Sequence, residues 1–208
     1  MAERKSSEER REQIIGATLR IVARKGFASV TLRDVATEVG IAHGLIRHYF
    51  AGRDELVAAA FDHAVTAELA SDEQLLAGLD PIAALAAWFS TTPEDHYLVW
   101  IDAWSEAPRN PALAAALERH HRDCERILAD VIRRAVAAGA ASTADVDADS
   151  RMLTALADGL AVQAHAMSIV DAREADDIVF GAVEARLAIA PGSLAAAGRA
   201  PARGQWLG

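Results

Sequence analysis

The chain is poor in the features that mark several classes of protein. It has one cysteine in 208 residues, so no disulfide can form within it, which fits the reducing cytoplasm. No uninterrupted apolar run approaches the ~20 residues that a membrane-spanning helix needs. The opening residues MAERKSSEERREQ carry charges with no apolar stretch behind them, so we expect no secretory signal. These absences predict a cytoplasmic protein without disulfides or a membrane anchor.

The alternation of apolar and polar residues that indicates half-buried strands is also missing. Instead, alanine is frequent and apolar residues recur at spacings of three and four, which is typical of amphipathic helices. An apolar fraction of 52% excludes a wholly disordered chain. The sequence therefore predicts an all-α fold.

Capping residues, prolines and glycines divide the chain into expected helices. Ser6-Ser7-Glu8-Glu9 has the form of a capping box, and Gly26 supplies a stop. Asp80 and Asn110 each precede a proline at the first helical position. Residues 72–79 fit either a loop or a short helical piece. The pattern predicts helices at about 6–25, 31–40, 42–50, 53–70, 81–90, 93–106, 110–139, 147–169 and 173–189.

Positive charge is scarce overall, yet it gathers at one end. The formal net charge is −9. Residues 1–53 hold ten Lys or Arg and six Asp or Glu, a net of +4, and the remainder holds eleven and twenty-four, a net of −13. A basic head can approach phosphate, while DNA repels an acidic body. The uneven distribution predicts a nucleic-acid contact in the first 53 residues.

Two short amphipathic segments, 31–40 and 42–50, meet at a turn that begins with Gly40. This spacing is typical of a helix-turn-helix, because a glycine can take the positive φ that reverses the chain within about three residues. The exposed side of the second helix would enter the major groove, and helix amino ends can hold phosphate. By spacing alone, a helical hairpin with a solvated basic face is the alternative. We expect DNA contacts from Thr31, Arg33, His43, Gly44, Leu45, Arg47, His48, Tyr49 and Arg53.

The segment VTLRDVATEVGIAHGLIRHYFAGRDEL resembles the signature of TetR-family transcriptional regulators. The residues that carry the resemblance are Thr31, Ala36, Gly40, Gly44, Phe50 and Leu56. Two positions depart from the family pattern: Arg47 replaces the usual tyrosine, and Arg53 replaces the usual lysine. Arginine favours guanine edges, so an operator preference of members with tyrosine does not carry over. The form GLIRHYF, with WIDAW at 100–104 and LADGL at 156–160, resembles the BetI-like branch of choline-responsive repressors.

The resemblance implies a nine-helix subunit in two parts. Residues 1–52 would form a three-helix helix-turn-helix DNA-binding domain, and residues 53–190 a larger ligand-binding and dimerisation domain. It further implies a homodimeric repressor that binds a palindromic operator in double-stranded DNA and is released by a small-molecule effector. Residues 191–208 are rich in Gly, Pro and Ala, and this composition predicts a disordered tail.

Aromatic residues in the middle of the chain suggest an effector pocket. Indole faces with an acid nearby suit an organic cation, such as a quaternary ammonium or a polyamine. The alternative is that the tryptophans fill the core of an alanine-rich bundle. Under the first interpretation the pocket would be lined by Phe61, Trp88, Phe89, Trp100, Trp104, Asp158, Gln163 and Met167.

Small residues and apolar stripes mark the last two expected helices. In the family such helices pair with their mates into a four-helix dimer interface; packing within the chain is the alternative. The predicted interface residues are Gly159, Val162, Ala166, Ile178, Gly181, Ala182 and Ala185.

Other functions receive little support from the residues. His120 and Cys124 share a helix face, but no third group of matching type lies near them, so we expect no metal site. No nucleophile–base or paired-carboxylate arrangement has supporting spacing, so we expect neither an enzyme nor a cofactor. A module whose basic head binds an acidic protein partner, or a small helical enzyme, are the alternative functions.

Overall fold

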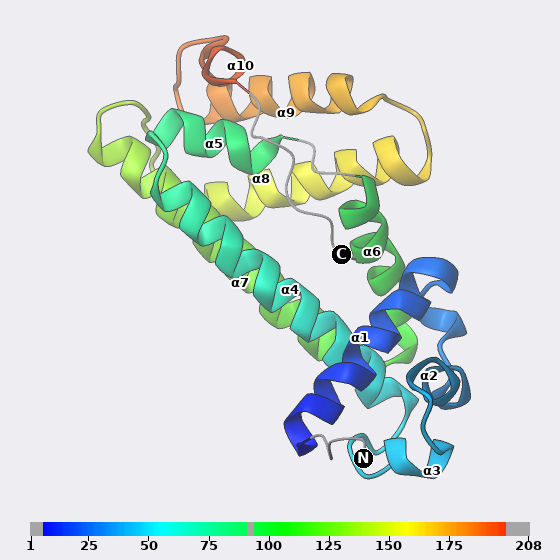
Figure 1. The fold of residues 1–208 in the computed structure, drawn as a ribbon. Helices are drawn as coiled ribbons and strands as arrows, with labels where there is room; N and C mark the ends of the chain where they lie inside the picture. The colour runs from blue at the N-terminus through cyan, green and yellow to red at the C-terminus, as the bar shows by residue number, and fades with distance from the viewer. Residues whose placement is uncertain (1–5, 91–93, 199–208) are drawn as a thin grey trace. The chain divides into compact units, whose positions relative to one another are not determined.

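The computed structural model describes residues 6–90 and 94–198 (Figure 1), and within these ranges it is helical, without strands, as the sequence predicts. A π-helix, Val162–Ala166, follows α8. Two 3₁₀ helices, η1 (Phe27–Ser29) and η2 (Ala107–Arg109), follow α1 and α6. The α-helices are α1 (Ser7–Lys25), α2 (Leu32–Val39), α3 (His43–Ile46), α4 (Arg53–Ala77), α5 (Pro81–Phe89), α6 (Glu94–Glu106), α7 (Pro111–Ala137), α8 (Val146–Ala161), α9 (Ala172–Arg186) and α10 (Ser193–Ala197).

At the predicted helix starts, side chains accept hydrogen bonds from first-turn amides that have no partner within the helix. Ser6 Oγ accepts from the Glu9 amide at 3.1 Å, and the Glu9 carboxylate accepts from the Ser6 amide at 2.6 Å. This is the complete capping box that the sequence predicts. Asp80 accepts from the Ile82 amide at 2.9 Å and so opens α5 at Pro81. The start predicted at residue 93 lies outside the described residues.

Helix α4 is longer than the sequence predicts. It continues past residue 70 to Ala77, so most of the ambiguous segment 72–79 is helical. The extension is stabilised by burial of Leu76 and by Arg134 of α7, which donates to the carbonyl oxygens of Leu76 at 2.8 Å and Leu79 at 2.6 Å. The carbonyls at and just beyond a helix end lack i+4 donors, and here Arg134 binds two of them; the Leu76 carbonyl also accepts from the Leu79 amide at 3.2 Å.

The predicted disordered tail is wrong for its first part, because residues 193–197 form α10. Leu194 is fully buried. The Glu184 carboxylate of α9 accepts from the amides of Gly192 and Leu194, both at 2.8 Å. The Gly- and Ala-rich composition predicts disorder because it gives no sign that Leu194 is buried or that a carboxylate of another helix binds this segment. Residues 199–208 lie outside the described residues.

Two other boundaries differ from the sequence prediction. Regular α-helix in α3 spans only four residues. Beyond it, the amides of His48 and Tyr49 donate to carbonyls three residues earlier, as in a 3₁₀ helix. Helix α8 ends at Ala161 instead of near 169, because the hydrogen bonding widens into the π-helix. Ser168 follows with a φ of 52°. No helix in the described part of the chain is long and apolar enough to cross a membrane.

The described residues fall into two compact units. Unit 1 comprises residues 6–67 and 99–120, and unit 2 comprises residues 68–90, 94–98 and 121–198. Phe61 lies in the core of unit 1, where its ring meets Phe27, Trp100 and His120 edge to face. The core of unit 2 contains Leu85, Leu128, Ile132, Leu153, Val183 and Leu194.

Candidate DNA-binding head and effector pocket

The turn between α2 and α3 has the left-handed backbone that the sequence predicts. Gly40 adopts φ 75° and ψ 38°, a region that residues with a Cβ avoid. Its amide donates to the Ala36 carbonyl at 2.9 Å, and the Ile41 amide shares that acceptor at 3.0 Å. The chain therefore reverses within three residues and leaves α2 and α3 as a helix pair.

The core holds one side of this pair. Val35 and Ile46 are fully buried, and Ala36 and Phe50 nearly so. Thr31 caps α2 by accepting from the Asp34 amide at 3.1 Å. The α2 and α3 backbone is thus set by one cap, one glycine turn and four buried side chains.

The other side of α3 is open. His43, Gly44, Arg47 and His48 are exposed, and an added Cβ at Gly44 would meet nothing within 4 Å. Leu45 and Tyr49 are half-buried. At the amino end of α2, Thr31 and Arg33 are exposed as well. Eight of the nine predicted DNA-binding residues therefore lie on α3, on the turn that follows it or at the start of α2.

Arg53, the ninth predicted residue, is bound within the molecule. Its guanidinium donates to the carbonyl oxygens of Val30 and Phe27 and to the carboxylates of Asp54 and Glu106. Burial acts to lower the pKa of Arg53, but the hydrogen bonds to Glu106 and Asp54 outweigh it and raise this pKa above its ordinary value. Four of its five N–H groups are used, and one remains for a phosphate oxygen. Its DNA contact stays a prediction.

The predicted pocket residues divide between the two units. Phe61, Trp100 and Trp104 belong to unit 1, where the two indole centroids lie 5.9 Å apart. Phe61 and Trp100 are buried, and Trp104 is half-buried. Within unit 1 these rings form part of the core, which favours the core-filling alternative for Phe61 and Trp100.

The remaining predicted pocket residues lie in unit 2. Trp88 and Gln163 are half-buried, and Met167 is 59% exposed. Asp158 Oδ2 lies 3.8 Å from His121 Nδ1. Phe89 is buried and lines a hollow.

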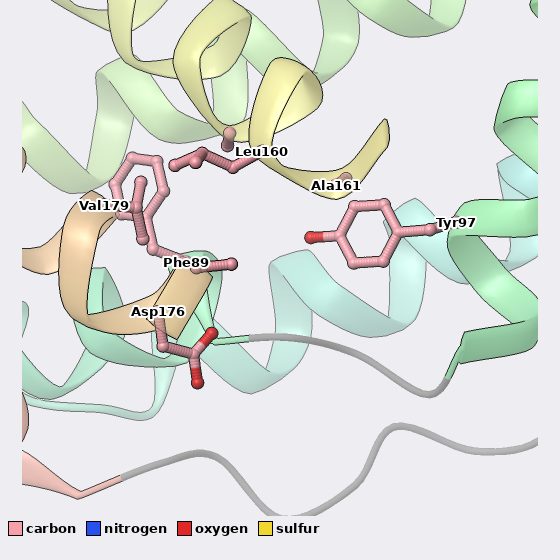
Figure 2. Close-up of a pocket in the computed structure, with 8 residues that line it drawn as sticks. Phe89, Tyr97, Leu160, Ala161, Asp176 and Val179 are labelled. Atoms are coloured by element: carbon pink, nitrogen blue, oxygen red, sulfur yellow. The ribbon is translucent and has the colours of Figure 1, made fainter. Parts of the chain in front are cut away.

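Figure 2 shows this hollow, which lies between α5, α6, α8 and α9 of unit 2. It is open to solvent: the roughly 240 Å³ of empty space among its lining residues includes solvent at its mouth, and the enclosed part is about 10 Å³. The Tyr97 hydroxyl points into it, and the Asp176 carboxylate, which is almost fully buried, comes from α9. We call it the unit 2 hollow. Its lining residues are Phe89, Tyr97, Ala157, Leu160, Ala161, Ala175, Asp176 and Val179.

Two polar residues of the unit 2 hollow, Tyr97 and Asp176, are not among the predicted pocket residues. Tyr97 lies within the aromatic-rich segment 88–104, a signal that could have found it. Its ring stacks on His165 of the π-helix, with centroids 5.0 Å apart and planes at 12°. π-Helical segments are frequent at functional sites. Asp176 gives no such signal, because it sits beside Asp177 and only the fold shows which one is buried.

Five of the seven predicted dimer residues, which come from α8, the π-helix and α9 of unit 2, are exposed in the described part of the chain. Gly159, Ala166, Gly181 and Ala185 are exposed, and Ile178 is 42% exposed. Val162 and Ala182 are half-buried. An added Cβ at Gly159 or Gly181 would meet nothing within 4 Å. The five exposed residues therefore keep open surface in the described part of the chain, and their place in a dimer interface stays a prediction.

His120 pairs with a carboxylate. Its Nε2 lies 2.9 Å from Asp62 Oδ1, which also accepts from Arg119 at 2.8 Å. Burial acts to raise the pKa of Asp62, but the hydrogen bonds from Arg119 and His120 outweigh it and lower this pKa below its ordinary value. In the described residues no group of three or more His, Cys, Asp or Glu side chains could hold a metal ion.

The exposed α3, preceded by a glycine turn and a capped α2, defines a helix-turn-helix protein. Residues 14–60 match the family model "Bacterial regulatory proteins, tetR family". Residues 82–188, just over half of the chain, match "BetI-type transcriptional repressor, C-terminal". The chain belongs to the TetR family of transcriptional regulators, with a BetI-type C-terminal region.

Curated relatives agree with this family. The HTH-type transcriptional regulator BetI of Paraburkholderia phymatum is 33% identical over 114 residues, which cover 51% of this chain and 58% of that protein. BetI of Burkholderia lata is 30% identical over 112 residues, which cover 50% of this chain and 58% of that protein. The chain thus spans less than two thirds of the length of these relatives.

Solved structures show the same fold. A regulator from Saccharomonospora viridis, crystallised in complex with choline, has a TM-score of 0.76 at 22% identity and covers 87% of this chain and 98% of its own. A TetR transcription regulator from Haloarcula marismortui has a TM-score of 0.74 at 22% identity, with 86% and 99% covered.

Proposed function

We propose that this protein is a homodimeric repressor that binds a palindromic operator in DNA and is released by a small-molecule effector. The observation that carries the proposal is the exposed face of α3 behind the Gly40 turn, in a chain of the TetR family. Because its target is DNA, we place the protein in the cytoplasm.

Each DNA-binding residue has a role that follows from its position. The exposed side chains of His43, Arg47 and His48 are suited to base edges in the major groove, and Gly44 lets the helix backbone approach the DNA. Thr31 and Arg33 at the start of α2 are suited to phosphate, which fixes register without reading sequence. Arg47 favours guanine through two parallel hydrogen bonds.

The open face of α8 and α9 supports a dimer. Small residues such as Gly159 and Gly181 let helix backbones approach closely, and Ile178 adds apolar area. A dimer suits a palindrome, because two recognition helices about one DNA turn apart, roughly 34 Å, read two half-sites.

The unit 2 hollow supports an organic cation as effector. Phe89 and Tyr97 offer aromatic rings, and the Asp176 carboxylate offers negative charge in a buried place. Aromatic rings and a carboxylate together bind quaternary ammonium groups. The choline complex of the Saccharomonospora viridis regulator is consistent with this class of ligand. The effector weakens DNA binding only as far as it prefers the conformation that cannot bind DNA.

A gel shift with the DNA upstream of its own gene tests the regulator function. We expect a complex at about 0.15 M salt that the same unlabelled DNA displaces and unrelated DNA does not, because base contacts add to the phosphate term. Binding without sequence preference would contradict the proposal. It would instead favour a basic head that binds acidic proteins, and turnover of a small molecule would favour an enzyme.

Thermal unfolding tests the effector class. A quaternary ammonium such as choline at 100 times its dissociation constant stabilises the folded state by about 2.7 kcal/mol, which raises Tm by roughly 5–10 °C. The matched control is its uncharged carbon isostere, in which a tert-butyl group replaces the trimethylammonium group. We expect Asp176→Asn to abolish the shift and Asp158→Asn to retain it. Stabilisation by anions or neutral lipophiles, with no effect of cations, would contradict this prediction.

A further inference from the structure

The 3₁₀ helix η1 joins α1 to α2, and both the amide and the carbonyl oxygen of its first residue, Phe27, are bound by side chains of other helices. The Phe27 amide donates to Asp102 Oδ2 of α6 at 2.6 Å. The Phe27 carbonyl oxygen accepts from Arg53 Nη2 at 2.6 Å, and the Val30 carbonyl oxygen accepts from Arg53 Nε at 3.1 Å. The next residue, Thr31, is the cap of α2. The connection into the DNA-reading pair is thus tied to α4 and α6.

Glu106 completes this set of bonds. Its Oε1 accepts from Arg53 Nη1 at 2.7 Å, and its side chain is 6% exposed, against 27% for Arg53. A buried carboxylate holds a guanidinium strongly, because little water competes for it. Arg53 therefore has its geometry set by α6. We call Asp102, Arg53 and Glu106 the η1 clamp.

Gly26 shows how closely α6 approaches the backbone here. A Cβ added at Gly26 would lie 2.9 Å from Asp102 Oδ2, and its φ is 76°. Backbone conformation and available space both require glycine at this position. The Asp102 carboxylate is thus packed against the main chain that leaves α1.

We propose that the η1 clamp fixes α2, and with it α3, in the orientation that reads DNA, so that Arg53, Asp102 and Glu106 are positioning residues. The clamp rests on the proposed operator binding. In this role Arg53 contributes to DNA binding indirectly, by holding the protein backbone at η1. If it bound phosphate, it would instead contact the DNA itself. The two roles make opposite predictions for the acidic partners.

Removing an acidic group separates these roles by the sign of the effect. Glu106→Ala and Asp102→Ala each delete a negative charge from a unit that faces DNA, and electrostatics alone would tighten binding. In Glu106→Ala the release of Arg53 for phosphate would tighten binding further, whereas Asp102 holds the Phe27 amide and its removal leaves the bonds of Arg53 in place. If the clamp positions α2, both variants bind the operator about tenfold more weakly, since a charged hydrogen bond is lost. The salt dependence stays as in the wild type, because no phosphate contact is removed.

The experiment combines operator titration with amide hydrogen exchange on the full chain without DNA. We expect faster exchange at Phe27 and through α2 in both variants. Asp102→Asn, which keeps an oxygen that can accept from the Phe27 amide, recovers part of both effects. Glu118→Ala is the matched control, because it removes one exposed negative charge from α7 in the same unit. It leaves exchange in α2 unchanged.

Tighter operator binding by the variants, or wild-type exchange at Phe27 and α2, would overturn the clamp. If the wild type shows no sequence-preferring DNA binding, the repressor function fails, and the exchange arm still decides whether the clamp holds α2. If Glu106→Ala does not fold, Asp102→Ala at the half-buried carboxylate provides the same comparison.

Discussion

Arg47→Ala is expected to weaken operator binding by about ten- to hundredfold, because one two-point contact with guanine contributes about 1–3 kcal/mol of discrimination. Arg47 follows α3 and is exposed, so its removal leaves no cavity and no unpaired buried group. Combining it with Tyr49→Ala removes a second side chain from the same surface. Titration of labelled operator, with circular dichroism and size-exclusion chromatography to monitor fold and dimer, measures the result.

Arg33→Ala is the informative comparison for Arg47→Ala. If Arg33 contacts phosphate, its removal weakens binding equally for all DNA sequences. The slope of log affinity against log salt concentration then falls by about 1. Arg47→Ala instead reduces the ratio between the affinity for the operator and the affinity for unrelated DNA. Retention of full sequence preference by the Arg47 and Tyr49 double variant, with intact fold, would contradict the assignment of this surface.

Phe61→Ala is expected to destabilise the fold by about 3–5 kcal/mol, the range for truncating a buried phenylalanine. Its ring lies 5.2 Å from that of Trp100 and 6.1 Å from that of Phe27. Removing it opens a cavity that these edge-to-face neighbours cannot close. Thermal unfolding monitored by circular dichroism should show a decrease of roughly 10 °C in Tm.

The Phe61 result also decides between the two interpretations of the central aromatics. If Phe61 instead lined an empty ligand cavity, its truncation would lower the stability of the protein little and would lower its affinity for the effector. Tyr97→Ala is the matched control: Tyr97 is half-buried and lines the unit 2 hollow, so its truncation should lower Tm much less. Equal Tm values for Phe61→Ala and the wild type would contradict the core assignment.

Local chemistry made the head of the molecule predictable from sequence. The Ser6 box, the Thr31 cap and the Gly40 turn each act over three or four residues, and all three take the predicted form. Their partners are backbone groups of the same segment, so no knowledge of the remaining chain is needed. The resemblance to the TetR family rests on this same segment.

Contacts between distant segments account for what the sequence did not predict. Arg53 lies at a helix start, where a basic side chain suits phosphate, and nothing nearby indicates that Glu106 will bind it 53 residues later. The helical spacing of Phe61 predicts that it lies on a buried face. It does not indicate whether this face packs against other aromatic rings or against a ligand. Leu194 is a single leucine among small residues, and only its burial reveals α10.

The docking of α10 has a consequence for the order in which the protein is made. Helix α10 contacts α5, more than one hundred residues earlier in the chain, and Leu194 fills part of the unit 2 core. That core cannot close until residue 194 has left the ribosome. The described residues of unit 1 end at His120, so α2 and α3 have all their described core partners earlier in synthesis. During translation the helix-turn-helix is therefore complete before the core of unit 2 can close.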